Sequence, residues 1–218
     1  MAEGSAASAG AEPIRGAEPA GPQPPSQQQH VNGAVLLPMA AAQAFRVITH
    51  PRNEQIFRHL EHCAHHEVLA DDGSGRVLVE SEHVATWRLL ALHGHLRTRL
   101  LVEQDHRALV SRFKLIHGRF SPLRTFQGRW EVHPQPPERC AQAHGSNAGS
   151  PGSLGGQCCE LTLEQELQPA VWLPPPLGGL LRQLACRQLR GVFQDLQAEA
   201  ARINAGRPSL WDSEPQPP

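Results

Sequence analysis

The sequence contains no tyrosine, no dense run of lysine and arginine, no long apolar stretch and no CxxC cysteine pair. Its 20 basic and 21 acidic side chains leave a net charge of −1. Because proteins that bind nucleic acid usually carry a basic stripe for the phosphates, we expect no nucleic-acid partner. Because no run approaches the ~18 apolar residues that cross a bilayer, we also expect no membrane-spanning helix.

The chain also has no nucleophile elbow, no phosphate-binding glycine loop and no HExxH motif. Four side chains that can ligate zinc recur at helical spacing, namely His59, His62, Cys63 and His66. On a helix they would share one face, but no carboxylate or second cysteine pair completes a site around them. We therefore expect neither a metal ion nor a cofactor.

The five cysteines, at positions 63, 140, 158, 159 and 186, form an odd number with no motif spacing. Free thiols in a reducing compartment are the simplest interpretation. The N-terminus lacks the basic stretch and apolar core of a secretory signal, and its three Glu against one Arg weigh against a transit peptide. We expect a soluble intracellular protein of the cytosol, with a plastid or mitochondrion as the alternative location.

Two segments of the chain are rich in proline and glycine. The first 33 residues carry five Pro and five Gly, and residues 134–157 carry four Pro and five Gly, with few large apolar side chains in either. Such segments cannot bury enough surface to offset the entropy of ordering them. We predict one domain over residues 40–205 with a disordered insertion at 134–157, between disordered tails at 1–39 and 206–218.

The pattern inside that domain predicts a strand, a helix, a series of strands and a last long helix. Residues 45–49 are predicted to form a short strand. His50-Pro51 is predicted to start a helix with Ile56, Phe57 and Leu60 on one face. Residues 71–75 form a turn signal between two strands. Apolar and polar residues then alternate with period two, as in antiparallel strands with one wet face, over 92–103, 109–115, 124–132 and 159–167.

The last helix is predicted from Leu177 to about Ile203, a length of ~38 Å. Its apolar stripe drifts around the axis beyond Gly191, which predicts a bend or a close approach of another element there. The fold class is therefore α+β. We expect a curved antiparallel sheet of about seven strands wrapped around the C-terminal helix, with one or two short helices after the first strand.

A sheet of this size and one helix cannot fill the enclosed volume with their own side chains. A void of ~300 Å³ would cost about 7 kcal/mol, which rivals the stability of a typical domain. Either the interior collapses or a ligand occupies it, and we favour the ligand. Its predicted contacts are Trp87, Leu96, Leu100, Phe113, Leu115, Phe126, Trp130, Leu163, Gln165, Leu181, Leu184, Gln188 and Val192.

Alternation also places polar side chains on the inner face, namely Ser81, His83, Ser111, His117, Gln165 and Gln188. A few polar groups on an apolar wall can orient the head group of a ligand. Alternatively, each of them finds a local partner in the backbone. If the protein is an enzyme, His83 and His117 are its candidates for acid–base catalysis.

The order of elements resembles that of the START-like helix-grip superfamily. The resemblance rests on residues 48–51 (ITHP), 87–90 (WRLL), 126–132 (FQGRWEV) and the helix headed by prolines at 174–176. It looks most like the polyketide cyclase and coenzyme Q-binding branch of plants and algae. It implies a hydrophobic cavity for a lipid, an isoprenoid quinone or a polyketide-like molecule, and no single catalytic constellation.

We therefore expect a non-enzymatic carrier of a hydrophobic small molecule or lipid, with peripheral membrane contact for ligand exchange. The first alternative is a cyclase or dehydratase on the same fold. The second is an interaction module that recruits a protein partner through its disordered segments.

Overall fold

The computed structural model describes residues 28–89, 92–116, 121–136, 138–140, 157–172 and 174–212. The strands are β1 (Gln29–Leu37), β2 (Leu60–Asp71), β3 (Arg76–Leu89), β4 (Leu92–Asp105), β5 (Val110–Leu115), β6 (Leu123–Gln135) and β7 (Cys158–Pro169). The helices are α1 (Ala41–Thr49) and α3 (Pro175–Asn204), with short 3-10 helices η1 (Asn53–Gln55) and η3 (Leu210–Asp212).

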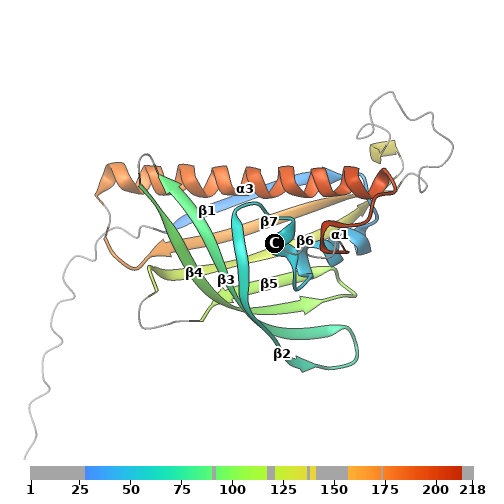
Figure 1. Ribbon diagram of the computed structural model, residues 1–218, viewed down its shortest axis with the longest axis horizontal. Coiled ribbons are helices and arrows are strands. Elements are labelled where there is room, and N and C mark those ends of the chain that lie inside the picture. The colour runs from blue at the N-terminus through green and yellow to red at the C-terminus, as the bar shows by residue number, and fades with distance from the viewer. Residues whose placement is uncertain are drawn as a thin grey trace, which may run out of the picture.

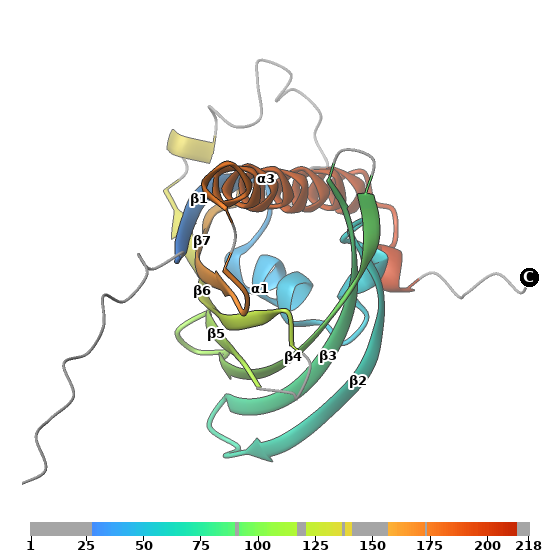
Figure 2. The same cartoon turned by 90° about the vertical axis from the view of Figure 1, so that its left-hand side faces the viewer.

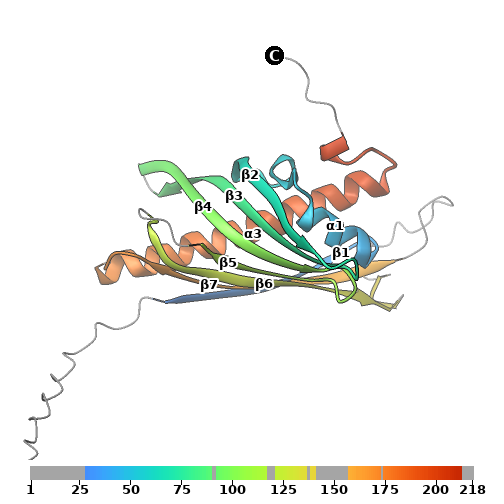
Figure 3. The ribbon, with the colours of Figure 1, turned by 90° about the horizontal axis from the view of Figure 1, so that it is seen from below.

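The strands form a single antiparallel sheet in the order β1-β7-β6-β5-β4-β3-β2. The sheet curves strongly, and α3 lies across its open side (Figures 1 and 2). Seen from below, the strands spread in a fan across α3 (Figure 3). The fold is the predicted α+β helix-grip arrangement, with seven strands and a long C-terminal helix.

Helix α3 is attached to both flanks of the sheet. On the β1 side, a Cβ placed on Gly33 would lie 2.8 Å from the Phe193 ring and 3.0 Å from Leu189, so glycine allows the helix to approach closely. On the other flank, Arg58 donates its backbone N–H and its Nε to the Asp195 carboxylate, at 3.0 and 2.6 Å. The helix therefore bridges β1 and the turn that leads into β2.

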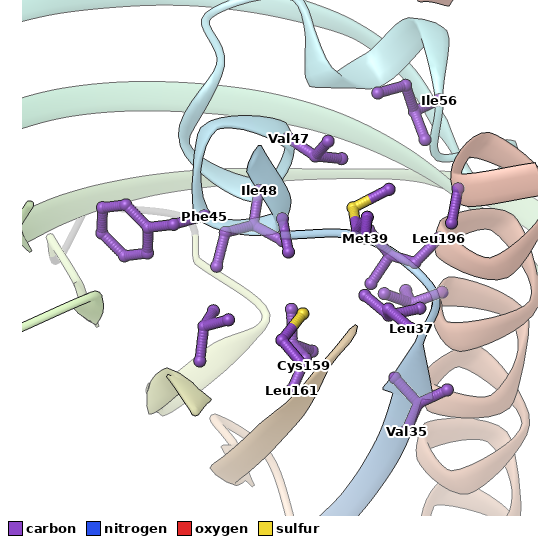
Figure 4. Packing of buried hydrophobic residues seen from close by; sticks show 14 of the residues in the cluster. Val35, Leu37, Met39, Phe45, Val47, Ile48, Ile56, Cys159, Leu161 and Leu196 are labelled. Carbon is purple, nitrogen blue, oxygen red and sulfur yellow. The ribbon is translucent and has the colours of Figure 1, made fainter. Parts of the chain in front are cut away.

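One end of the space between the sheet and α3 is filled by α1, which lies beneath the C-terminal half of α3 (Figure 1). Phe45 of α1 belongs to one cluster with Leu37, Leu161 and Leu196, and each of these residues is at most 1 % exposed (Figure 4). Side chains from β1, α1, β7 and α3 thus form the main hydrophobic core.

The N-terminal part of the sequence prediction is wrong in three respects. Strand β1 lies within the predicted disordered tail, because Val31, Val35 and Leu37 alternate with exposed or half-buried residues and bury against α3. The predicted strand at 45–49 is part of α1, whose β-branched residues were read as strand formers. The predicted helix after His50-Pro51 is only η1, and β2 already begins at Leu60.

The C-terminal boundary at residue 206 is also wrong, because the chain continues to pack after α3. Trp211 in η3 is buried and stacks on His50 with ring centroids 4.5 Å apart. Arg52 donates to the Trp211 carbonyl oxygen, and the Ser209 hydroxyl donates to the Glu199 carboxylate. Residues 213–218 lie outside the described residues.

The predicted insertion at 134–157 joins β6 to β7, which are neighbours in the sheet. Pro134 and Gln135 still belong to β6, and residues 141–156 lie outside the described residues. Cys140 and Cys158 form a disulfide, so the prediction that all five thiols are free is wrong. Their pairing follows from the sheet register, which places Gln135 beside Cys158 where the chain turns back.

The long helix agrees with its prediction except at Gly191. Apart from the helix's own neighbouring backbone, no atom of the described residues lies within 4 Å of a Cβ placed there, so the predicted close approach is wrong. The apolar stripe of α3 turns around the helix axis beyond Gly191 because α3 makes contacts on two of its flanks. Phe193 lies beside Gly33 of β1, whereas Asp195 pairs with Arg58.

Candidate functional site

The inner face of the sheet is set by the strand register. Trp130 pairs with Leu163, and Phe113 pairs with Gly128, so the large side chains of β5, β6 and β7 line one face. Gly128 makes this possible, because a Cβ there would lie 2.5 Å from the Phe113 ring. The Phe113 and Phe126 rings are in contact, with centroids 5.2 Å apart. These aromatic side chains pack toward Ala185 and Leu189 of α3.

The predicted contact residues differ in how deeply they are buried. Leu100, Leu163 and Val192 are buried. The half-buried members are Leu96, Leu115, Phe113, Phe126, Trp130, Gln165, Leu181, Leu184 and Gln188. The side chain of Trp87 lies outside the described residues, as does His117.

Half-buried aromatic residues beneath a covering helix indicate incomplete filling. Phe113, Phe126 and Trp130 lie on the face that α3 crosses, yet each stays partly accessible. At the α1 end, by contrast, Phe45 and Leu161 on the same side of the sheet are 1 % and 0 % exposed. The space between the sheet and the N-terminal half of α3, which we call the open half, is therefore less tightly packed than the α1 end.

A hollow lies on the opposite, outer face of the sheet and has a volume of about 630 Å³. Its lining includes Arg112, Lys114, Arg129, Glu103 and Glu164, which alternate with the inward-facing residues of their strands. The mixed charges distinguish it from the predicted apolar cavity.

Polar groups gather on the inner face near β3. Ser81 is 3 % exposed, and the register places it beside Leu100 of β4 and His66 of β2. Burial lowers the pKa of His83 from 6.5 to about 4, with smaller contributions from His66 and His59. Burial likewise lowers the pKa of His59, against an opposing effect of Asp195. His83 is therefore uncharged at neutral pH.

The four potential zinc ligands do not share a helix face, because β2 begins at Leu60 and places neighbouring residues on alternate sides. His59 precedes the strand, and the Cys63 thiol donates to the carbonyl oxygen of His65 at 3.1 Å. Among the residues that the structure describes, no group of three or more His, Cys, Asp and Glu side chains is placed to hold a metal ion.

Sequence reasoning missed two features of this region. The first is the pair of Arg58 and Asp195, although Asp195 lies seven residues after Gln188 and thus on the same side of the predicted helix. The second is the exposed apolar pair Val171 and Trp172 before α3, which are 66 % and 61 % exposed.

Within the described part of the chain, no helix is long and apolar enough to cross a membrane.

Three solved structures show the same fold at low sequence identity. The Zhui aromatase/cyclase from Streptomyces sp. R1128 has a TM-score of 0.55 and 16 % identity, covering 83 % of this chain and 99 % of its own. A START superfamily protein from Mycobacterium smegmatis has a TM-score of 0.53 and 13 % identity, covering 80 % and 98 %. One part of the di-domain aromatase/cyclase BexL of the BE-7585A biosynthetic pathway has a TM-score of 0.50 and 13 % identity, covering 80 % and 47 %.

These likenesses establish a START-like helix-grip fold. No curated protein matches the sequence significantly. Residues 24–206 match the profile of a domain of unknown function, DUF220. Because that match spans most of the chain, including β1 and all of α3, the protein belongs to the DUF220 family.

Proposed function

We propose that this protein binds a hydrophobic ligand between the sheet and the N-terminal half of α3, and carries it without changing it chemically. The observation that carries the proposal is the partial exposure of Phe113, Phe126 and Trp130 beneath a helix. Apolar walls that protein atoms do not fill cost free energy in proportion to the void. A ligand that fills the space would recover that free energy.

The composition of the wall favours a ligand with both flat and flexible apolar parts. Phe113, Phe126 and Trp130 offer aromatic faces, and Leu181 and Leu184 offer aliphatic side chains from α3. A lipid, an isoprenoid quinone or a polyketide-like molecule fits this description. The aromatase/cyclase and START names of the structural neighbours agree with such ligands, and the resemblance to the coenzyme Q-binding branch points to a quinone.

Ligand exchange would take place at the end where α3 begins. Val171 and Trp172 lie there, exposed, between β7 and α3. Tryptophan favours the boundary between membrane and water, so these residues are suited to brief contact with a membrane surface. Peripheral contact at this end would bring the N-terminal half of α3, and with it the open half, next to a bilayer.

The alternative, a cyclase or dehydratase, depends on His83, because His117 lies outside the described residues. The inward position of His83 favours this idea, but its low pKa opposes it. A general base works best when its pKa lies near the operating pH. With a pKa of about 4, His83 would be a weak base at neutral pH, so binding is the better-supported role.

Solvent extraction of freshly purified full-length protein, followed by mass spectrometry, tests the proposal. We expect an apolar compound in near-stoichiometric amount, recovered unchanged after incubation. Titration with naphthalene, followed by its fluorescence, provides a second test that needs no retained ligand. If the extract contains no apolar compound and naphthalene does not bind, the proposal is wrong.

A further inference from the structure

Ser81 and His83 form a polar pair on the inner face of β3. They are two residues apart on one strand, so their side chains point to the same side of the sheet. Their neighbours on β4 are Leu100 and Thr98, which are buried on that same face. The pair therefore lies on the wall of the space that we assign to the ligand.

Both side chains carry a polar atom that lacks a protein partner. Ser81 Oγ and His83 Nδ1 are buried, and neither has a hydrogen-bond partner among the residues that the structure describes. Most buried polar groups in folded proteins are hydrogen-bonded, because leaving one unpaired costs free energy. Two such atoms at adjacent positions of one wall indicate a place for a hydrogen-bonding guest.

The surroundings favour a guest without charge. His59 and His66 act electrostatically on His83, β2 places Cys63 beside it, and Arg58 already occupies the carboxylate of Asp195. None of these groups offers a free permanent cation to an anionic ligand. At pH 7, a histidine with a pKa of about 4 is protonated in roughly one molecule in a thousand. A carboxylate or phosphate would thus be desolvated there without a counter-charge.

We propose that Ser81 and His83 form the head-group subsite of the ligand cavity and hold an uncharged carbonyl or hydroxyl group of an otherwise apolar ligand. The Ser81 hydroxyl can donate to a carbonyl oxygen or accept from a hydroxyl, and a neutral imidazole can accept at Nδ1. This inference rests on the proposed function, since it needs a ligand in the open half. It narrows the ligand class to ketones, quinones, phenols and alcohols.

Three probes of one shape test the subsite with the full-length chain at pH 7, namely naphthalene, 2-naphthol and 2-naphthoate. We expect 2-naphthol to bind roughly 3- to 10-fold more tightly than naphthalene, as one net hydrogen bond implies. We expect 2-naphthoate to bind most weakly of the three. Fluorescence titration gives the three dissociation constants.

The variants Ser81→Ala and His83→Leu should each reduce the preference for 2-naphthol while leaving naphthalene affinity within about twofold. Thr49→Ala is the control, because Thr49 lies in α1, away from the open half, and its hydroxyl already donates to the Phe45 carbonyl oxygen. It should leave the preference unchanged. If His83→Leu does not fold, Ser81→Ala alone decides the test.

The possible outcomes separate the two proposals. If naphthalene itself does not bind, the proposed function fails. If naphthalene binds but 2-naphthol shows no advantage, or keeps it in both variants, only the subsite is overturned. Tightest binding of 2-naphthoate would overturn the assignment to an uncharged head group.

Discussion

The two halves of the space beneath α3 are built from the same sheet and the same helix, yet they are filled differently. At the α1 end, Leu37, Phe45 and Leu196 are at most 1 % exposed. In the open half, Phe113 and Leu181 pack against a smaller apolar cluster and remain half-buried. The difference lies in α1, which lies beneath the C-terminal half of α3 (Figure 1), and in η3, because both contribute side chains to the core at this end.

The two ends of the space beneath α3 differ in what they contribute to the protein. The α1 end holds the sheet and helix together through close packing, which tolerates little change in volume. On our proposal, the open half contributes less to stability and holds the ligand. Substitutions should therefore affect stability at one end and ligand binding at the other.

The largest effect is expected from truncating the packed core. Leu161→Ala should lower the free energy of unfolding by about 3–5 kcal/mol, because Leu161 is fully buried and its neighbours cannot collapse into the gap. Leu184→Ala in the open half should cost only about 1 kcal/mol. Urea unfolding of both variants measures the contrast. Equal losses would show that the halves are packed alike.

The next effect is a pH dependence that comes from His83. Burial holds its pKa at about 4 in the folded protein, below the ordinary 6.5, so the unfolded chain binds more protons between these values. The stability from neutral His83 is complete above pH 6.5 and is lost as the pH falls toward 4, by about 3 kcal/mol in total.

Urea unfolding at a series of pH values from 7 to 4 checks this expectation. His83→Leu should flatten the loss relative to the wild-type protein. His93→Leu is the control, because His93 is exposed on β4. An unchanged slope in His83→Leu would mean that another group, such as His59, causes the loss.

A third prediction tests whether the sheet itself is tightly packed, so that loose packing is confined to the space between the sheet and α3. Gly128→Ala should destabilise the protein by about 1–3 kcal/mol, because its Cβ would lie 2.5 Å from the Glu164 carbonyl oxygen and from the Phe113 ring. Thermal and urea unfolding measure the change. A neutral result would show that β6 and β7 can separate easily, and that the sheet itself is loose.

A fourth substitution fills the open half. Leu181→Trp should weaken naphthalene binding about tenfold or more, because the larger side chain would occupy the volume of the ligand, while stability changes by less than about 1 kcal/mol. Gln183→Trp, at an exposed position of the same helix, should leave binding unchanged. Unaltered binding in Leu181→Trp would place the ligand elsewhere.

The smallest effect is expected at Gly191 of α3. Gly191→Ala should stabilise the protein by about 1 kcal/mol, because alanine favours the helix and, apart from the helix's own backbone, no atom of the described residues lies within 4 Å of the added methyl group. Ligand affinity should not change. Destabilisation would show that Gly191 serves a bend or contact after all.

The sequence predicted most of the sheet and the last helix because their patterns are long or repeated. Alternation recurs in four successive segments and identified β4 to β7, and the 71–75 turn separated β2 from β3. The first strand and the first helix were not predicted. β1 and α1 stand apart from that run of strands, and β1 follows a segment rich in Pro and Gly. Only the pairing of β1 with β7, a contact distant in sequence, makes it a strand.

The sequence predicts which residues lie on the inner face of the sheet, but not how much space is left beside them. Period two places Phe113, Trp130 and Leu163 on one side of the sheet, and the register confirms that placement. How far each side chain is covered depends on where α3 and α1 dock, which local patterns do not encode. For the same reason, the disulfide between Cys140 and Cys158 could not be inferred from spacing.

The ion pair that fastens α3 to the turn before β2 has unequal partners. The Asp195 side chain is 4 % exposed, whereas that of Arg58 is 76 % exposed. Loss of the aspartate would release a guanidinium into water and remove the acceptor of the residue 58 backbone N–H. Loss of the arginine side chain would leave a negative charge in the protein interior, where the backbone N–H of residue 58 would remain as its hydrogen-bond donor. The side chain on the surface is therefore the one whose replacement would do more damage.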